Sequence, residues 1–493
     1  MTEYKCECGA VFRVDSADDI GTIFCTCPSC GAKKTLDKEE QERRDTLAEW
    51  LKEHFGELKR EATLSEVLDI LGETIKFDND IKLIVFLAML TAFTSKEQVN
   101  IIMEGESSVG KTYTIHEIIL FFPESCWLKK NGVTPTSFFY DDQRVLMDKN
   151  TLQKVELVRP SKDASDIEKQ EYKEKRDNCV MLQDFERKII WLPDMPDVKV
   201  MEKLRSLLSH DDKVCNYTST MTNQHVGLQA KTTLLKGFGV FIICCCTPML
   251  DEQETSRAFQ LNPGWSKEKE AACLDLISRR EASPEFNKLL EDNPKRSWLR
   301  NRIEMIASAK VNEVFVGEEL SLKVLDWFNE KRKVSTPKSS REFTRFRSLM
   351  KAWALFNLWT RKQDEDKNLY CEEKDFDVAK LVYESIVEAS AFNLCLEEYT
   401  FYKALEAEYP YRELSEGFRV SNAHTLFYDK NGRACSDKRL RNMLESFCRE
   451  GLLRKEKQGQ TYYYHIQSLD HNENIHVGVG ESSGWINNCE ERA

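Results

Sequence analysis

Three nearly continuous apolar runs lie in the middle of the chain, at 99–103, 188–192 and 239–246. Short runs without polar alternation are typical of strands in a parallel sheet, because helices cover both faces of such a sheet. After the first run and a Gly-containing segment, residues 114–122 carry apolar side chains at helical spacing. The pattern therefore predicts an α/β fold with a parallel sheet, in which the first strand leads through a loop into a helix.

The segments outside these strands predict helices, one hairpin and a polar tail. Helical spacing of apolar residues among many charges indicates a helical connector at 37–77. Twelve of the 20 residues in 159–178 are charged, which predicts an exposed insertion or a solvated helix. Residues 216–237, with Thr and Val around a central turn, predict a β-hairpin. The polar stretch from 468 onward is expected to be a loose tail.

The segment from 399 to 466 predicts three helices followed by a strand pair. Ser436 fits the N-cap of the third helix, and its buried stripe is expected to consist of Leu440, Met443, Leu444 and Phe447. The opposite face carries Arg439, Asn442, Ser446 and Arg449.

This C-terminal segment resembles a winged-helix domain, with 452–455 and 461–466 as the wing. Between 430 and 457 there are nine Lys and Arg but four Asp and Glu, which favours contacts with DNA phosphates. We therefore predict DNA contacts by Arg439, Asn442 and Arg449. Docking of a protein is the alternative.

The segment after the first strand fits the pattern G-x-x-x-x-G-K-[ST] with the residues Gly105, Glu106, Ser107, Ser108, Val109, Gly110, Lys111 and Thr112. In such a loop the glycines allow backbone N–H groups to surround phosphate oxygens. Lys111 is expected to reach the β- and γ-phosphates, and the Thr112 hydroxyl to bind Mg²⁺. A chance Gly-rich turn is the alternative. The motif predicts binding of ATP or GTP.

A phosphate-binding loop of this pattern, called a P-loop, also needs an acid at the end of a second strand. Asp194 follows the run at 188–192 and is the expected Mg²⁺ ligand. The usual pattern has two adjacent acids, but here Pro193 and Met195 flank Asp194. Whether Asp194 binds Mg²⁺ or activates water is therefore open, and Asp197 is a second candidate.

The order of these motifs over 78–358 resembles that of the AAA+ superfamily, and within it the replicative helicase-like ATPases of archaea, plasmids and phages related to minichromosome maintenance helicases. The resemblance implies an ATPase core with a helical lid, a preference for ATP, and DNA as partner. It also implies a homo-oligomeric ring, of which a hexamer is one form.

The resemblance further implies roles for single residues. Thr247 takes the place of sensor 1, and Arg257 that of an arginine finger for a neighbouring subunit, unless it is a surface arginine paired with local acids. Arg341 is the expected sensor 2 arginine, with Arg345 as its rival. The hairpin corresponds to one that tracks DNA in the pore, which makes Lys231 a candidate phosphate contact. An ordinary hairpin with solvent-facing lysines is the alternative.

Two cysteine turns near the N-terminus predict a structural zinc site. Cys6 and Cys8 form one turn, and Cys27 and Cys30 form another about 20 residues later, which is zinc-ribbon spacing. Cys25 is a competing ligand because Cys25-x-Cys27 repeats the spacing of the first turn. So short a segment cannot build a core of its own, so bound Zn²⁺ would supply the folding free energy. Two reduced turns without metal are the alternative.

Composition restricts the setting in which the protein acts. With 71 Lys and Arg against 83 Asp and Glu the net charge is −12, which argues against uniform coating by nucleic acid and leaves local basic patches. The longest apolar runs fall short of the roughly 18–20 residues that span a bilayer, and the N-terminus has no apolar signal-peptide core. We expect a cytoplasmic protein with no membrane partner and with its 17 cysteines reduced.

Together the patterns predict a zinc ribbon at 1–36, a helical connector at 37–77, an AAA+ P-loop core at 78–265, a helical lid and connector at 266–390, a winged helix at 391–467 and a flexible tail at 468–493. The expected function is that of an ATP-hydrolysing, helicase-like DNA translocase of replication or mobile-element type, with ATP, Mg²⁺ and Zn²⁺. The alternatives are a nucleotide-switched DNA-binding regulator or loader without unwinding activity, and a signalling or defence ATPase whose terminal modules bind protein or RNA.

Overall fold

The computed structural model describes residues 56–467 apart from short gaps, together with the backbone of four strands before them. The gaps fall at 97, 106, 134–144, 150, 152, 159, 162–164, 210–213, 224–226, 247–256, 332–338, 385–391, 393, 395, 412–416 and 432–433. The N-terminal strands pair as two antiparallel hairpins and are β1 (Thr2–Lys5), β2 (Val11–Val14), β3 (Thr22–Thr26) and β4 (Lys33–Asp37). The predicted zinc ligands Cys6, Cys8, Cys27 and Cys30 lie outside the described residues, so the zinc ribbon stays a prediction.

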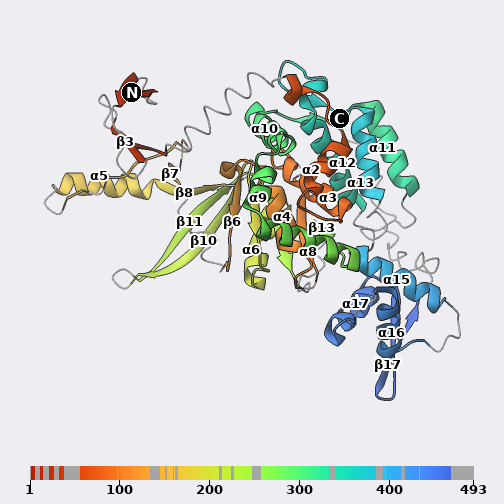
Figure 1. Ribbon diagram of the computed structural model, residues 1–493. Coiled ribbons are helices and arrows are strands. Elements are labelled where there is room, and N and C mark those ends of the chain that lie inside the picture. The colour runs from red at the N-terminus through yellow and green to blue at the C-terminus, as the bar shows by residue number, and fades with distance from the viewer. Residues whose placement is uncertain are drawn as a thin grey trace, which may run out of the picture.

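Five parallel strands form the central sheet (Figure 1). Their order is β13-β5-β12-β9-β6, so the strand that enters the P-loop lies between β13 and β12. Their bounds are β5 (Asn100–Glu104), β6 (Trp127–Lys129), β9 (Ile189–Leu192), β12 (Val240–Cys245) and β13 (Ala258–Leu261). The three predicted apolar strands are confirmed as β5, β9 and β12, and with them the α/β fold with a parallel sheet. The outer strands β6 and β13 are too short for the apolar pattern to mark.

Helices cover both faces of this sheet. On one face, α3 (Asn79–Thr91) and α4 (Lys111–Ile119) share a core with Ile101 and Met103. On the other face, α6 (Val198–Ser209) shares a core with Ile102. Because successive strand residues point to opposite faces, a doubly covered strand needs apolar side chains at nearly every position. Glu104, two residues after Ile102, departs from this rule at the end of β5.

A second sheet, in the order β10-β11-β8-β7, adjoins the first. Its strands are β7 (Val145–Asp148), β8 (Cys179–Asp184), β10 (Val214–Asn223) and β11 (Gly227–Lys236). The antiparallel pairing of β10 with β11 confirms the predicted hairpin, which projects from the body in Figure 1. The helix α5 (Asp166–Asp177) has no buried residue, which confirms the solvated helix predicted there.

Further helices complete the main body. They and two short strands are α2 (Leu64–Gly72), η1 (Glu124–Cys126), α8 (Lys267–Ala282), α9 (Pro284–Glu291), α10 (Pro294–Ala309), β14 (Val314–Phe315), α11 (Glu318–Lys331), α12 (Ser339–Phe356), η3 (Leu358–Thr360), β15 (Leu369–Tyr370) and α13 (Glu373–Glu384). Leu71 of α2 and Leu349 of α12 belong to the same core as β5. The segment predicted as a connector therefore ends inside the main core. Of the helices in the described residues, none is long and apolar enough to cross a membrane.

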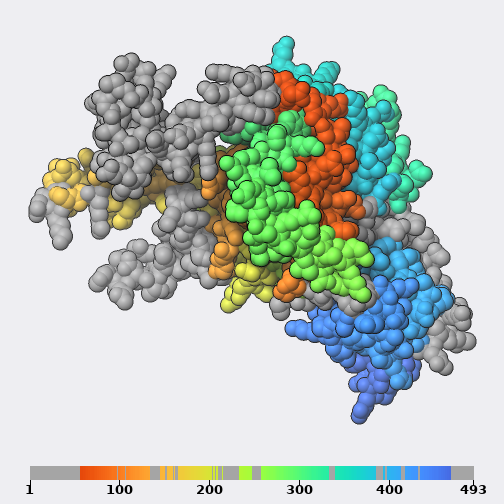
Figure 2. All heavy atoms as spheres, viewed as in Figure 1, coloured from red at the N-terminus to blue at the C-terminus, as the bar shows by residue number. Residues whose placement is uncertain are grey.

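The C-terminal module has a hydrophobic core of its own. It consists of α15 (Leu396–Glu408), α16 (Val420–Asn431), α17 (Asp437–Arg449), β16 (Leu453–Gln458) and β17 (Thr461–Ile466), and forms the blue lobe in Figure 2. Ser436 caps α17, since its Oγ accepts a hydrogen bond of 3.3 Å from the Arg439 backbone N–H. The predicted stripe is buried at Leu440, Met443, Leu444 and Phe447. The elements follow the predicted order, and their assignment as a winged helix stays a prediction.

Candidate nucleotide site

The P-loop connects the end of β5 to the start of α4, as predicted. Gly105 and Gly110 have φ angles of +141° and +99°, which side chains other than hydrogen rarely allow. A Cβ at Gly105 would also lie 2.7 Å from Oδ1 of Asn262. Gly110 precedes α4 and gives it no side-chain cap. The first N–H groups of α4 are therefore available to an anion. Glu106 lies outside the described residues.

Lys111 is folded back over this loop. Its side chain is 8% exposed, and Nζ donates a hydrogen bond of 2.7 Å to the Gly105 carbonyl and lies 4.0 Å from Sγ of Cys246. Thr112 follows on the exposed side of the helix. The residues present thus fit a nucleotide with Mg²⁺: the loop amides and Lys111 would hold phosphate oxygens, and the Thr112 hydroxyl would bind the metal.

The buried thiol of Cys244 lies close to several of the predicted site residues. Burial raises its pKa to about 11, against the opposing effects of Trp191, Thr112 and the charge of Lys111, and with a small raising effect of Asp194. These groups from β9, α4 and β12 therefore lie around one point at the carboxyl edge of the sheet. Cys244 and Cys245 are buried in the core, whereas Cys246 is exposed.

The two acids after β9 have different surroundings. Both Asp194 and Asp197 are exposed. The carboxylate of Asp197 accepts a hydrogen bond of 2.8 Å from the Lys199 backbone N–H at the start of α6. Asp197 thus bonds to the start of α6, whereas Asp194 is the acid whose charge acts on Cys244.

The arginines predicted for the site lie at the other edge of the sheet. Arg257 directly precedes β13, whose first residue, Ala258, pairs with Asn100 at the start of β5. Five residues of β5, roughly 16 Å of strand, separate that edge from the P-loop. Arg345 is 8% exposed, donates a hydrogen bond to the Ala258 carbonyl and lies 5.0 Å from the Phe259 ring. The structure therefore does not bring Arg257 or Arg345 to the P-loop of the same chain.

The remaining predicted site residues are Arg341, Lys231 and Thr247. Arg341 is exposed in the first turn of α12 and lies near enough to Arg345 to lower the pKa of that guanidinium, an effect secondary to burial. Lys231 lies in β11 opposite Ser219, and its side chain is outside the described part of the structure, as is Thr247.

One residue of the basic face of α17, Arg439, is partly buried, whereas Lys438, Asn442 and Arg449 are exposed. Arg439 is paired with Glu397 of α15 at 2.6 Å, and their side chains are 14% and 11% exposed. Glu397 also accepts a hydrogen bond of 2.7 Å from Asn262, which follows β13 in the core. The predicted DNA contact Arg439 thus takes part in a contact between the module and the core.

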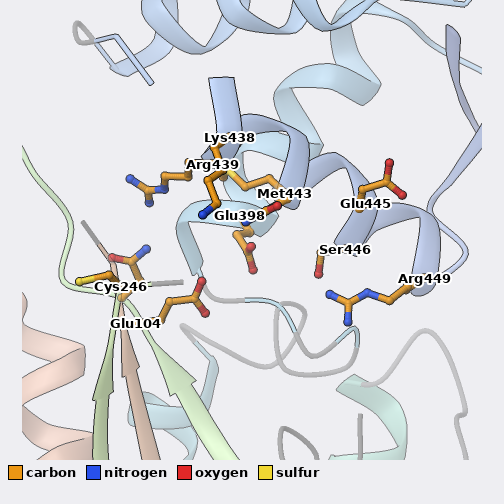
Figure 3. Close-up of a pocket in the computed structure, with 11 residues that line it drawn as sticks. Glu104, Cys246, Glu398, Lys438, Arg439, Met443, Glu445, Ser446 and Arg449 are labelled. Carbon is orange, nitrogen blue, oxygen red and sulfur yellow. The ribbon is translucent and has the colours of Figure 1, made fainter. Parts of the chain in front are cut away.

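A cavity of about 420 Å³ lies beside this contact (Figure 3). Its walls include Glu104, Cys246 and Asn262 on the core side, and Glu398, Lys438, Arg439, Asn442 and Arg449 on the module side. Helical periodicity predicted that Arg439, Asn442 and Arg449 share one face of α17. It did not predict that this face lies beside Glu104 and Cys246. Sequence reasoning missed Glu104, although an acid directly before the first P-loop glycine was a signal.

The ion pair of Lys269 and Asp78, which sequence reasoning also missed, contacts the P-loop. Nζ of Lys269 donates hydrogen bonds to the carbonyls of Val109 at 3.1 Å and Gly264 at 2.7 Å, and pairs with the Asp78 carboxylate. The two charged side chains are 12% and 10% exposed. Burial raises the pKa of Asp78, and Lys269 opposes this rise. The pair ties the loop to the start of α3 and to the segment before α8.

Comparisons with known proteins give weak likenesses only. No family model and no curated protein matches the chain. Among solved structures, the chain is similar to an active helicase, Cch of SCCmec type IV, at 9% identity and a TM-score of 0.30, with 84% of this chain and 72% of that chain covered. It is also similar to the apo C-terminal region of NrS-1, at 12% identity and a TM-score of 0.21, covering 83% and 77%. The third is Cdc6p from Pyrobaculum aerophilum, at 14% identity and a TM-score of 0.17, covering 84% and 91%. Because all three TM-scores lie below 0.5, the function proposed below is inferred from the residues of the site.

Proposed function

We propose that the protein is an AAA+-type ATPase that hydrolyses ATP with Mg²⁺ and couples hydrolysis to movement on DNA, as a helicase-like translocase. The observation that carries this proposal is the geometry of the P-loop. A buried lysine begins a helix without a side-chain cap, the helix follows a central parallel strand after a six-residue loop, and both motif glycines have positive φ. Helix N–H groups and an ammonium group converge there, as phosphate binding requires.

Within this proposal the predicted residues have separate tasks. Residues 105–112 hold the phosphates, Thr112 and Asp194 bind Mg²⁺, and Thr247 takes the sensor 1 position. The distance of Arg257 from the P-loop of its own chain supports a contact with the nucleotide of a neighbouring copy, and hence a homo-oligomeric ring. Arg341 remains the proposed sensor 2 residue, since the Ala258 carbonyl holds Arg345.

DNA is the proposed partner of the two projecting parts. Lys231 on the hairpin, and Arg439, Asn442 and Arg449 on α17, are the proposed contacts, and a Zn²⁺ ion held by Cys6, Cys8, Cys27 and Cys30 would order the N-terminal segment. A nucleotide-switched DNA-binding regulator is the second candidate. One observation favours it: Glu397 of the module pairs with Arg439 of the same module and also accepts a hydrogen bond from Asn262 of the core.

We expect DNA to stimulate ATP hydrolysis by the full-length protein. Translocation on DNA requires that hydrolysis and DNA contact be coupled, so the steady-state rate should rise several-fold, on the order of 1 kcal/mol of coupling. Phosphate release would be measured without DNA, with single-stranded DNA and with duplex. Intact ATP binding with no response to either DNA would contradict the motor and favour the regulator.

Glu397→Gln is expected to strengthen DNA binding. The change removes the charge that holds Arg439 and weakens the hydrogen bond to Asn262, so Arg439 should become available to DNA beside the exposed Asn442 and Arg449. The loss of one partly buried ion pair corresponds to about a 3- to 10-fold lower Kd. Fluorescence anisotropy with a labelled duplex at fixed salt would measure it.

Glu408→Gln is the matched control for this change, because it removes the same charge from an exposed position of the same helix. Equal DNA affinities of the two variants would show that the contact between the module and the core does not hide a DNA-binding face.

A further inference from the structure

Glu104 is a buried acid at the end of a central strand. It ends β5 after four buried residues and is 7% exposed. Its Oε2 atom is buried and has no hydrogen-bond partner in the described part of the chain. Burial of such a group without a partner is costly, so its presence indicates a role outside packing.

The Glu104 side chain points into the cavity between the core and the C-terminal module (Figure 3). Cys246 lines the same cavity, and its Sγ lies 4.0 Å from Nζ of Lys111. Since the lysine of a P-loop reaches the β- and γ-phosphates, the cavity adjoins the place of the terminal phosphate. A cavity of about 420 Å³ has room for water beside that phosphate.

The two acids after β9 do not provide both a Mg²⁺ ligand and a carboxylate that orients the attacking water. Asp194 has no acidic neighbour in the sequence, because Pro193 and Met195 flank it. Asp197, the next acid, is engaged by the Lys199 backbone N–H. If Asp194 binds Mg²⁺, a different carboxylate must orient the attacking water.

The surroundings of Glu104 suit a proton acceptor. Burial and the charge of Glu398, with a smaller effect of Glu397, raise the pKa of the Glu104 carboxyl well above its ordinary value, while Arg439 and Lys111 oppose the rise. A raised pKa makes the carboxylate a stronger base toward water.

We propose that Glu104 orients and polarises the water that attacks the γ-phosphate, in place of the missing neighbour of Asp194. This inference rests on the proposed ATPase function. The water oxygen bonds to the γ-phosphorus while the bond from that phosphorus to the β–γ bridging oxygen breaks. The water proton passes to the Glu104 carboxylate and is then released to phosphate or solvent, which leaves ADP and inorganic phosphate.

The test compares Glu104→Gln with Glu445→Gln in the full-length protein. Both residues line the same cavity, and both changes remove a carboxylate at nearly constant size. Glu104→Gln is expected to lower kcat about 100-fold or more, while the Kd for a fluorescent ATP analogue stays close to that of the wild type. Glu445→Gln is expected to keep most of the wild-type rate, because Glu445 is exposed and pairs with Lys455 of the module.

Glu104→Asp provides a second measurement and carries the comparison if thermal melting shows that Glu104→Gln is unfolded. It keeps the carboxylate but withdraws it by one methylene group, so a rate between those of the wild type and Glu104→Gln is expected. A wild-type rate in Glu104→Gln would overturn the inference, and so would an equal fall in the Glu445 variant or a loss of nucleotide binding. Absence of hydrolysis in the wild type would instead contradict the proposed function itself.

Discussion

Lys111→Ala is expected to remove ATP hydrolysis and most ATP binding. The substitution deletes the buried ammonium group that lies over the loop and that would contact the terminal phosphates. Loss of a charged hydrogen bond of about 3 kcal/mol corresponds to a Kd roughly 100-fold higher, and the rate should fall at least as far because charge on the transferred phosphoryl group is then unbalanced. Titration with a fluorescent ATP analogue and a phosphate-release assay would measure the two effects.

Lys331→Ala is a suitable control, because it removes an exposed lysine of α11 that pairs with Glu384 away from the P-loop. Wild-type ATP binding by a folded Lys111→Ala protein would refute the nucleotide site.

Lys111→Ala, mixed with Arg257→Ala, also tests whether neighbouring subunits share an active site. Lys111→Ala lacks the P-loop lysine, and Arg257→Ala lacks the proposed finger, so each should be inactive alone. If Arg257 acts on a neighbouring copy, mixed oligomers contain some interfaces with both residues and should regain part of the activity. A mixture as inactive as its components would contradict a finger that acts between subunits.

Arg302→Leu is expected to destabilise the main body by about 3–5 kcal/mol, which is the usual cost of removing one partner from a buried charged network. Arg302 is fully buried in α10. Its guanidinium donates to the carbonyls of Phe356 at 2.9 Å, Leu58 at 2.7 Å and Arg60 at 2.7 Å, and to Oδ1 of Asn357 at 2.9 Å. Leucine fills much of the space but removes the donor from the three carbonyls and one of the two donors from Oδ1 of Asn357, so the urea midpoint should fall.

Arg300→Leu is the matched control on the same helix, because Arg300 is exposed. It should shift the midpoint by no more than about 0.5 kcal/mol. Burial lowers the pKa of Arg302 to about 9, which shows how strongly this position disfavours the charge that its hydrogen bonds require. An unchanged midpoint in Arg302→Leu would mean that the network does not hold α10 to the segment before α2.

The contact between the module and the core gives the two candidate functions a common structural basis. Glu397 holds Arg439 and is itself held by Asn262, two residues after the Gln260 that pairs with β5. A nucleotide in the P-loop would add negative charge close to Glu104, Glu397 and Glu398. In a motor or in a regulator, release of this contact would link the nucleotide state to Arg439.

Much of this protein follows from local pattern. The runs at β5, β9 and β12 are apolar because both faces of the sheet are covered. The P-loop follows from two glycines and a lysine at fixed spacing between a strand and a helix. The exposed helix α5 and the buried stripe of α17 likewise depend on periodicity and charge within about a dozen residues, so the sequence by itself determined them.

The tertiary structure alone decided which of these elements meet. Pairing of Ala258 with Asn100 puts Arg257 a strand length from its own P-loop, and this depends on residues more than 150 positions apart. The same holds for Glu397, which joins Asn262 to Arg439, and for Glu104, whose position beside Glu398 appears only when the module covers the edge of the sheet. Periodicity shows which face of an element is buried, but long-range pairing and packing decide against what it is buried.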